Sequence, residues 1–127
     1  NNLQKPYIFK KTKYFDNRGY FQEIFLEKEF KKKIKFTAIA FSKKNVIRGL
    51  HIQKKKSQGK FVSVLKGKIF DVAVDLRKKS KTFGKYSQCT LSEKNGKLSL
   101  IFGLSISSIK LLLINLILLF FKKNFFA

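Results

Sequence analysis

The stretch that decides the fold runs from Phe61 to Leu76 and reads FVSVLKGKIFDVAVDL. It contains two runs rich in Val, Ile and Phe, Phe61–Leu65 and Ile69–Leu76, separated by Lys66-Gly67-Lys68. β-Branched and aromatic residues with a period of two, on either side of a short link that contains Gly, indicate two strands joined by a tight turn. The sequence therefore predicts a β-hairpin here, within a mostly β domain.

The second predicted strand carries two acids on one of its faces. Alternate side chains of a strand share a face, so Ile69, Asp71, Ala73 and Asp75 lie together. Acids on a strand that is otherwise fit for burial indicate a face that lines something polar, such as a ligand cavity. A solvated outer face explains the pattern equally well, and both interpretations stay open at this point.

The composition describes one domain with a real hydrophobic core. The chain has 127 residues, of which 44% are hydrophobic and 15% aromatic, so it is too apolar for a disordered basic tail. Its 7 Gly, 1 Pro and 1 Cys exclude collagen-like, proline-rich and disulfide-scaffold classes. The single Cys89 cannot form an internal disulfide, which favours a reducing compartment. The sequence indicates a short helix only within Glu27–Lys35.

The net charge of +22 raises the alternative of a basic module that binds nucleic acid or an anionic membrane. The charge comes from 26 Lys and only 3 Arg, whereas bidentate recognition of phosphates and bases is mainly the work of Arg. Lys, Phe, Ile and Asn are residues of AT-rich codons. We therefore attribute much of the charge to coding bias on a solvated surface, and we expect no nucleic-acid partner.

The one His of the chain, His51, lies three residues after Arg48 and next to a flexible Gly49-Leu50 pair. A lone His is more often structural than catalytic. No second His, and no Cys near it, could complete a metal site, so we predict no bound metal.

Three linked motifs nevertheless resemble one known family. In sequence order they are Phe15-Asp16-Asn17-Arg18-Gly19-Tyr20-Phe21-Gln22-Glu23; then Arg48–Gln53 with Gln58-Gly59-Lys60; and then Gly67–Arg77 with Ser80, Thr82, Phe83 and Gly84. Their order and spacing are similar to those of the dTDP-4-dehydrorhamnose 3,5-epimerases. The resemblance implies an all-β, cupin-type jelly roll. It further implies a cytoplasmic homodimer that acts without a cofactor on a dTDP-linked 4-keto-6-deoxy sugar.

The resemblance also assigns roles to individual residues. It implies that His51 is the base that removes the protons beside the ketone, because a His titrates near physiological pH. Lys60 matches the position that stabilises the enolate and contacts the substrate. Arg48 matches a substrate-contacting Arg, and Arg18 and Glu23 match a nucleotide-contacting pair. A surface turn explains the N-terminal pair equally well from composition alone.

The chain departs from the family pattern in two places. Where the family has Gln-x-Asn-x-Ser, this chain has Phe36, Ala38 and Ala40, which removes the polar groups expected there. The second departure is that no family motif follows Leu98. We therefore divide the chain into residues 1–98, the N-terminal part of an incomplete epimerase-like domain, and residues 99–127, an apolar tail.

Two interpretations of this tail compete. It is expected to be out-of-frame or degenerate sequence, because AT-rich codons in a wrong frame give its composition. Alternatively Leu98–Phe121 is a membrane-spanning helix, and only then would a membrane be a partner. The sequence also contains no Met, so we expect a partial chain.

Overall fold

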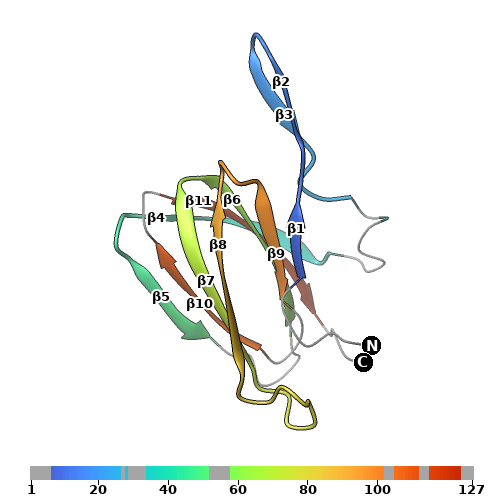
Figure 1. Ribbon diagram of the computed structural model, residues 1–127, viewed down its shortest axis with the longest axis vertical. Helices are drawn as coiled ribbons and strands as arrows, with labels where there is room; N and C mark the ends of the chain where they lie inside the picture. Colours follow the sequence, from blue (N-terminus) through green and yellow to red (C-terminus); the bar gives the residue numbers. More distant parts are fainter. Residues whose placement is uncertain are drawn as a thin grey trace.

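The protein is represented by a computed structural model, which describes residues 7–26, 28, 34–51, 58–101, 105–111 and 115–123. The regular elements of this part of the chain are β-strands (Figure 1). Their bounds are β1 Tyr7–Lys10, β2 Lys13–Asp16, β3 Gly19–Gln22, β4 Phe36–Ser42, β5 Ile47–His51, β6 Gln58–Lys66, β7 Lys68–Asp75, β8 Tyr86–Ser92, β9 Lys97–Ile101, β10 Ser105–Leu111 and β11 Asn115–Lys123.

The predicted hairpin is confirmed as β6 and β7, which are joined by Gly67 alone. The link has a positive φ of 92° at this residue. An L-amino acid with a side chain is strained in that conformation, so Gly is the residue that allows so short a connection. β6 is longer than the predicted strand Phe61–Leu65 at both ends. β7 begins one residue before the predicted strand Ile69–Leu76 and also ends one residue before it.

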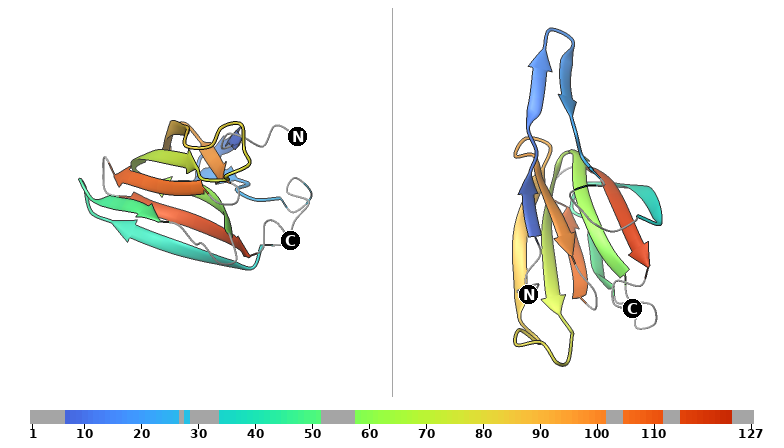
Figure 2. Two further views of the ribbon diagram at one scale, coloured as in Figure 1. Left: turned by 90° about the horizontal axis from the view of Figure 1, so that it is seen from below. Right: turned by 90° about the vertical axis from the view of Figure 1, so that its right-hand side faces the viewer.

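Two antiparallel sheets pack face to face and form a sandwich (Figure 2). One has five strands in the order β1-β9-β6-β11-β4, and the other has four in the order β5-β10-β7-β8. β2 and β3 form a separate two-stranded ribbon that projects from one end of the sandwich (Figures 1 and 2). The prediction of an all-β domain is confirmed.

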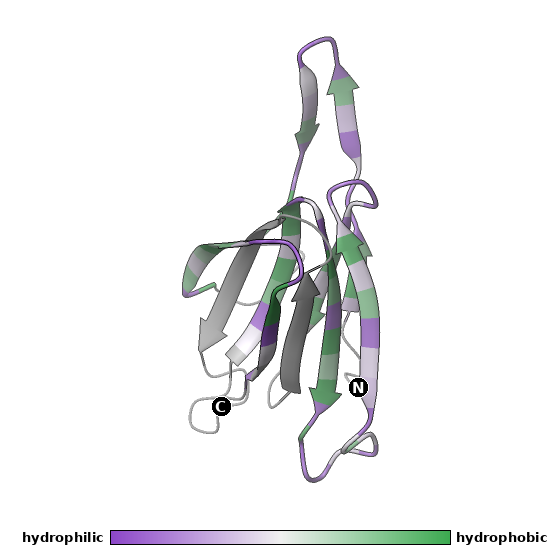
Figure 3. Cartoon of the chain, turned by 90° about the vertical axis from the view of Figure 1, so that its left-hand side faces the viewer, coloured by the Kyte–Doolittle hydropathy of each residue, from purple (hydrophilic) through white to green (hydrophobic). Residues whose placement is uncertain are grey.

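The acid-bearing face of β7 is the buried one. Side chains along β7 alternate between buried and half-buried positions, and Ile69, Asp71, Ala73 and Asp75 are buried. Ile69 packs in the core with Val62, Val64 and Leu91. Burial on this strand does not follow hydropathy, because hydrophilic positions also interrupt the hydrophobic strands (Figure 3) and two of them, Asp71 and Asp75, are buried. The solvated-face interpretation of Asp71 and Asp75 is therefore wrong.

The outer face of the five-stranded sheet is covered by the segment that follows β3. Phe61 of β6 points to this face, is only 4% exposed, and meets the ring of Phe25 edge-on at a centroid distance of 6.4 Å. The helix predicted within residues 27–35 lies mostly outside the described residues.

The described part of the apolar tail forms strands in both sheets. β10 pairs with β5 and β7, and β11 pairs with β6 and β4, all in antiparallel register. Among the residues that the structure describes, no helix has the length and apolar character needed to cross a membrane. The helix of the membrane alternative is thus not observed there, whereas the out-of-frame origin of residues 99–127 stays a prediction.

Candidate active site

A β-bulge in β5 sets the directions of Arg48 and His51. In the register with β10, Arg48 lies opposite Ile109, whereas His51 lies opposite Ser107. The two residues Gly49–Leu50 therefore oppose a single residue of β10, which is the pattern of a bulge. Residues three apart in a regular strand point to opposite faces. The extra residue brings Arg48 and His51 onto the same face of the sheet.

That common face is the one that looks into the sandwich. Across β10, the Arg48 position continues to Asp71 of β7, and the His51 position continues to Ala73. Directly opposite residues of neighbouring strands share a face, and both Asp71 and Ala73 are buried between the sheets. Since β5 is an edge strand, Arg48 and His51 remain exposed to solvent. The arrangement offers a base and a guanidinium at an open edge of the interior.

Arg48 is held in place by the opposite sheet. Its Nε donates a hydrogen bond to Ser42 Oγ at 2.8 Å, and its Nη2 donates to the carbonyl oxygen of Phe41 at 3.0 Å. Ser42 is buried at the end of β4, the edge strand of the five-stranded sheet. These bonds link the two edge strands and fix the guanidinium at the edge of the sandwich.

Lys60 and Asp71 form a charged pair between the two sheets. Lys60 extends from β6 and is half-buried, while Asp71 of β7 is only 2% exposed. Burial lowers the pKa of Lys60, and the charge of Asp71 partly restores it. Burial raises the pKa of Asp71 to about 6, against the opposing effects of the Ser99 hydroxyl and the Lys60 ammonium. The sequence predicts a role for Lys60 and a polar face of β7, but nothing in the sequence pairs Lys60 with Asp71.

The positions of β4 that share the interior face with Lys60, with β11 between the two strands, are apolar from Phe36 to Ala40. In the register with β11, Phe36 lies opposite Phe121, which in turn lies opposite Lys60. Ala38 and Ala40 follow on the same face of β4 and are half-buried, while Phe36 is 44% exposed. The residues that depart from the family pattern therefore lie on the interior face of β4.

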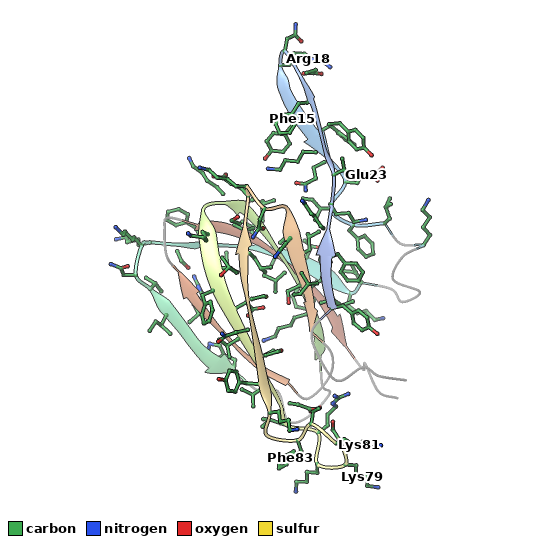
Figure 4. The ribbon with its side chains drawn as sticks, in the orientation of Figure 1. Phe15, Arg18, Glu23, Lys79, Lys81 and Phe83 are labelled. Carbon is green, nitrogen blue, oxygen red and sulfur yellow. The ribbon has the colours of Figure 1, made fainter. Side chains whose placement is uncertain are left out.

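Arg18 is placed far from this interior. It lies at the tip of the β2–β3 ribbon, where its backbone N–H and its guanidinium both donate to Asp16 (Figure 4). The ion pair is 2.7 Å long, and the Arg18 side chain is 85% exposed. The structure does not bring Arg18 together with His51 or Lys60 of the same chain.

Glu23 lies at the base of the same ribbon (Figure 4). It lines a cavity of about 240 Å³ whose other walls come from residues 9–12 and Tyr14. None of the residues proposed for the interior site takes part in this cavity. The predicted N-terminal pair and the predicted catalytic residues thus occupy two different places in one chain.

The last part of the third motif, from Asp75 onward, is structural. Asp75 accepts hydrogen bonds from the backbone and guanidinium of Arg77, from Ser80 Oγ at 2.6 Å and from Thr82 Oγ1 at 2.7 Å. These donors, Arg77 first, hold the pKa of Asp75 well below its usual range. The carboxylate organises the loop between β7 and β8, whose tip with Lys79, Lys81 and Phe83 lies at the opposite end from Arg18 (Figure 4).

Metal binding has no visible basis in this part of the molecule. No three His, Cys, Asp or Glu side chains of the described residues are grouped so that they could hold a metal ion. The described residues instead place a base, a guanidinium and a charge-paired ammonium at positions on the interior faces of the two sheets. Such a set can bind an anionic ligand and move a proton.

Comparison with known proteins finds relatives that match most or all of the chain. The family model of dTDP-4-dehydrorhamnose 3,5-epimerase matches residues 1–102. The epimerase of Methanothermobacter thermautotrophicus is 43% identical over 99 residues, which make up 74% of this chain and 54% of that protein. The crystal structure of the Sulfolobus tokodaii epimerase superposes with a TM-score of 0.89 and 33% identity, covering 100% of this chain and 75% of that chain.

A further relative was solved with a sugar nucleotide. This structure is the dTDP-6-deoxy-D-glucose-3,5-epimerase of Legionella pneumophila in complex with dTDP-4-keto-L-rhamnose. It superposes with a TM-score of 0.87 and 32% identity, covering 100% of this chain and 70% of that chain.

These matches establish the fold and the family. The predicted cupin-type jelly roll is confirmed, because structures of the family superpose on the whole chain. The chain spans about half the length of the curated relatives it matches. With a family model that matches residues 1–102 and relatives above 40% identity, the chain belongs to the dTDP-4-dehydrorhamnose 3,5-epimerase family.

Proposed function

We propose that this protein acts as a 3,5-epimerase of dTDP-L-rhamnose biosynthesis, on a dTDP-linked 4-keto-6-deoxyhexose. The observation that carries the proposal is the bulge in β5, which turns Arg48 and His51 onto the interior face that also bears Asp71, the partner of Lys60. The Legionella relative, solved with dTDP-4-keto-L-rhamnose, supports this class of substrate.

The proposed chemistry is the removal of protons beside a ketone. The carbonyl at C4 acidifies the hydrogens at C3 and C5, because either carbanion is stabilised as an enolate on the C4 oxygen. His51 takes the proton, and the electron pair of the broken C–H bond moves into the enolate. For inversion, a proton that comes from solvent water must reach the opposite face of the carbon, where it forms the new C–H bond and restores the ketone. Each removal in deuterated water therefore leaves a deuteron at C3 or C5.

Lys60 and Arg48 each stabilise one negatively charged group: Lys60 stabilises the enolate oxygen, and Arg48 binds the diphosphate of the nucleotide. The Lys60 ammonium faces the developing enolate oxygen, where a half-buried charge is more effective than one in water. The charge of Asp71 opposes the effect of burial, which lowers the pKa of Lys60, and so favours the ammonium form. Arg48, fixed by Ser42 and the Phe41 carbonyl, contacts the diphosphate of the nucleotide.

The proposal is tested by proton NMR of the sugar nucleotide in deuterated buffer. We expect the H3 and H5 signals of the 4-keto sugar nucleotide to disappear with time when the protein is added. The matched control is the same nucleotide with a hydroxyl at C4, which has no acidified neighbours and should keep both signals. Unchanged H3 and H5 signals in the ketone would contradict the function.

We also propose that the protein is a homodimer in which the β2–β3 ribbon serves the partner's site. The ribbon projects away from its own sandwich (Figures 1 and 2) and exposes aromatic side chains that a monomer would leave in water. Their exposed fractions are 62% for Tyr14, 74% for Phe15, 51% for Tyr20 and 65% for Phe21. The register places Tyr14 beside Phe21 and Phe15 beside Tyr20, so both faces of the ribbon carry exposed aromatic pairs, as is typical of an element that enters a protein interface. Arg18 could then contact the nucleotide bound to a second copy.

Mixed dimers test this arrangement. Arg18→Glu and His51→Ala should each lower deuterium exchange as pure proteins. A mixture of the two in equal amounts should recover about a quarter of the wild-type rate, because half of the dimers are mixed and each has one intact site. If Arg18 served its own chain, no mixed dimer would have an intact site and the mixture would stay as inactive as its parents.

The location and the remaining partners follow from the same proposal. We propose a cytoplasmic enzyme, in line with the reduced, half-buried Cys89. Nothing in the relatives or in the described residues favours the alternative of a nucleic-acid or anionic-membrane binding module.

A further inference from the structure

A second buried polar group lies beside the Lys60–Asp71 pair. Ser99 of β9 is 0% exposed and shares the interior face of its sheet with Val62, its register partner on β6. Its hydroxyl lies close enough to Asp71 to favour the charged carboxyl, and close enough to Cys89 of β8 to favour the thiolate. The polar cluster thus draws one residue from each of four strands, two in each sheet.

Two atoms of this cluster have unmet hydrogen-bonding capacity. Within the described residues, neither Asp71 Oδ1 nor Ser99 Oγ has a partner at regular hydrogen-bond geometry, although both are buried. A buried polar atom that is left unpaired is costly, and a hydroxyl that can rotate is the simplest donor for a neighbouring carboxylate. The Ser99 hydroxyl is a donor and Asp71 Oδ1 is an acceptor, so each is of the kind that the other lacks.

We propose that Ser99 is a positioning residue of the site: its hydroxyl donates to Asp71 Oδ1 and keeps this carboxyl ionised, so that Asp71 in turn keeps the Lys60 ammonium charged. Ser99 touches no substrate in this proposal and acts only through Asp71. It rests on the proposed function for its effect on the reaction, but the effect on Asp71 is a property of the folded chain alone.

The surroundings of Asp71 leave few other groups that could set its charge. On the strands packed around it, β10 presents Ile109 in the register position next to it. In the described part of the chain, the titratable groups at interior-face positions of the remaining strands include Lys10, Arg48, His51, Lys60, Asp75, Cys89 and Lys97. Lys10, Arg48 and His51 are not among the groups that shift the pKa of Asp71. Asp75 is occupied by Arg77, and Lys97 acts on Cys89. Lys60 and Ser99 therefore carry most of the stabilisation of a charged Asp71.

The test is a carbon-13 NMR titration of the carboxyl groups with labelled aspartate. The chain has three Asp, and those at 16 and 75 have lowered pKa values, so the resonance that titrates near pH 6 reports Asp71. Ser99→Ala should move this midpoint up by about half a pH unit to one unit, the effect of one lost hydrogen bond. Ser63→Ala is the matched control, because it removes another buried hydroxyl, on the opposite face of the sheet.

A third variant separates the hydroxyl from the packing. Ser99→Thr keeps the hydroxyl and should return the midpoint to the wild-type value, and the acidic limb of the exchange-rate profile should follow the midpoint in each variant. An unchanged or lower midpoint in Ser99→Ala would overturn the proposal. It would also be overturned if Ser99→Thr and Ser63→Ala raised the midpoint as much as Ser99→Ala does. Failure of the wild type to exchange deuterium would refute the proposed function and leave the titration result intact.

Discussion

Replacing His51 with alanine is expected to lower the rate of deuterium incorporation at C3 and C5 by about 10²–10⁴-fold, the usual contribution of a positioned general base. The effect should be on the rate of proton removal and not on binding, because the nucleotide diphosphate is assigned to Arg48. Initial rates of H3 and H5 signal loss, measured at saturating sugar nucleotide, give the fold-change directly.

Two controls keep this result specific. His51→Asn keeps a polar side chain of similar reach without the basicity, and it should be as slow as His51→Ala. Binding of dTDP, followed by calorimetry, should change little in either variant. Since His51 is the one His of the chain, its imidazole resonances also show whether the residue titrates in the pH range of the reaction. Exchange that survives in both variants within a few-fold would remove His51 from the role of base.

Asp75→Ala should have the largest effect on stability, a loss of about 3–5 kcal/mol in the free energy of unfolding. The wild-type carboxylate is 5% exposed and accepts from Arg77, Ser80 and Thr82. Its removal leaves a guanidinium that is only 21% exposed without its counter-charge, together with two hydroxyls that have lost their acceptor. Denaturant unfolding followed by circular dichroism measures the change.

Asp16→Ala is the matched control for this variant. Asp16 also pairs with an Arg two residues later, at 2.7 Å, but both side chains are exposed at the ribbon tip. Exposed ion pairs contribute little, so the unfolding midpoint should hardly move. Equal losses in the two variants would show that burial of the Asp75 pair is not the source of the stability.

The pH dependence of stability follows from the same carboxylate. The pKa of Asp75 is lowered in the fold from its ordinary value of 3.8, so the unfolded chain binds more protons below that value. The stability that this group gives is complete above about pH 4 and is lost as the pH falls. Asp75→Asn should remove this part of the acid destabilisation.

The β6–β7 hairpin was predictable because its signal is local. Period-two apolar residues on either side of Gly67 specify two strands and their turn without reference to the rest of the chain. The same alternation grouped Asp71 with Asp75. It could not decide which face of the strand is buried, because that depends on the second sheet, whose strands are distant in sequence.

The site depended on features that spacing alone does not encode. Arg48 and His51 are three residues apart and would point to opposite faces of a regular strand, and the bulge at Gly49–Leu50 reverses this. Lys60 meets Asp71 across two sheets. The placement of Arg18 on a projecting ribbon was likewise hidden, since a turn sequence does not say where its hairpin points.

The tail shows the limit of hydropathy as a signal. A long apolar run fits a membrane helix and buried strands equally well, because neither shows a strict period. The described residues of the tail occupy strand positions between β5 and β7 and between β6 and β4. Translation of the coding DNA after Gly96 in the other two frames would test the proposed out-of-frame origin.

The central claim is that the interior edge formed by Arg48, His51 and Lys60 binds a 4-keto sugar nucleotide and removes its protons through His51. Mass spectrometry of the sugar nucleotide recovered from deuterated buffer tests it most directly. The account predicts two deuterons in the ketone after incubation with the wild-type protein, one at C3 and one at C5, and deuteration slowed by about 10²–10⁴-fold with His51→Ala. Recovery of undeuterated ketone from the wild-type protein, or equal deuteration by His51→Ala, would contradict it.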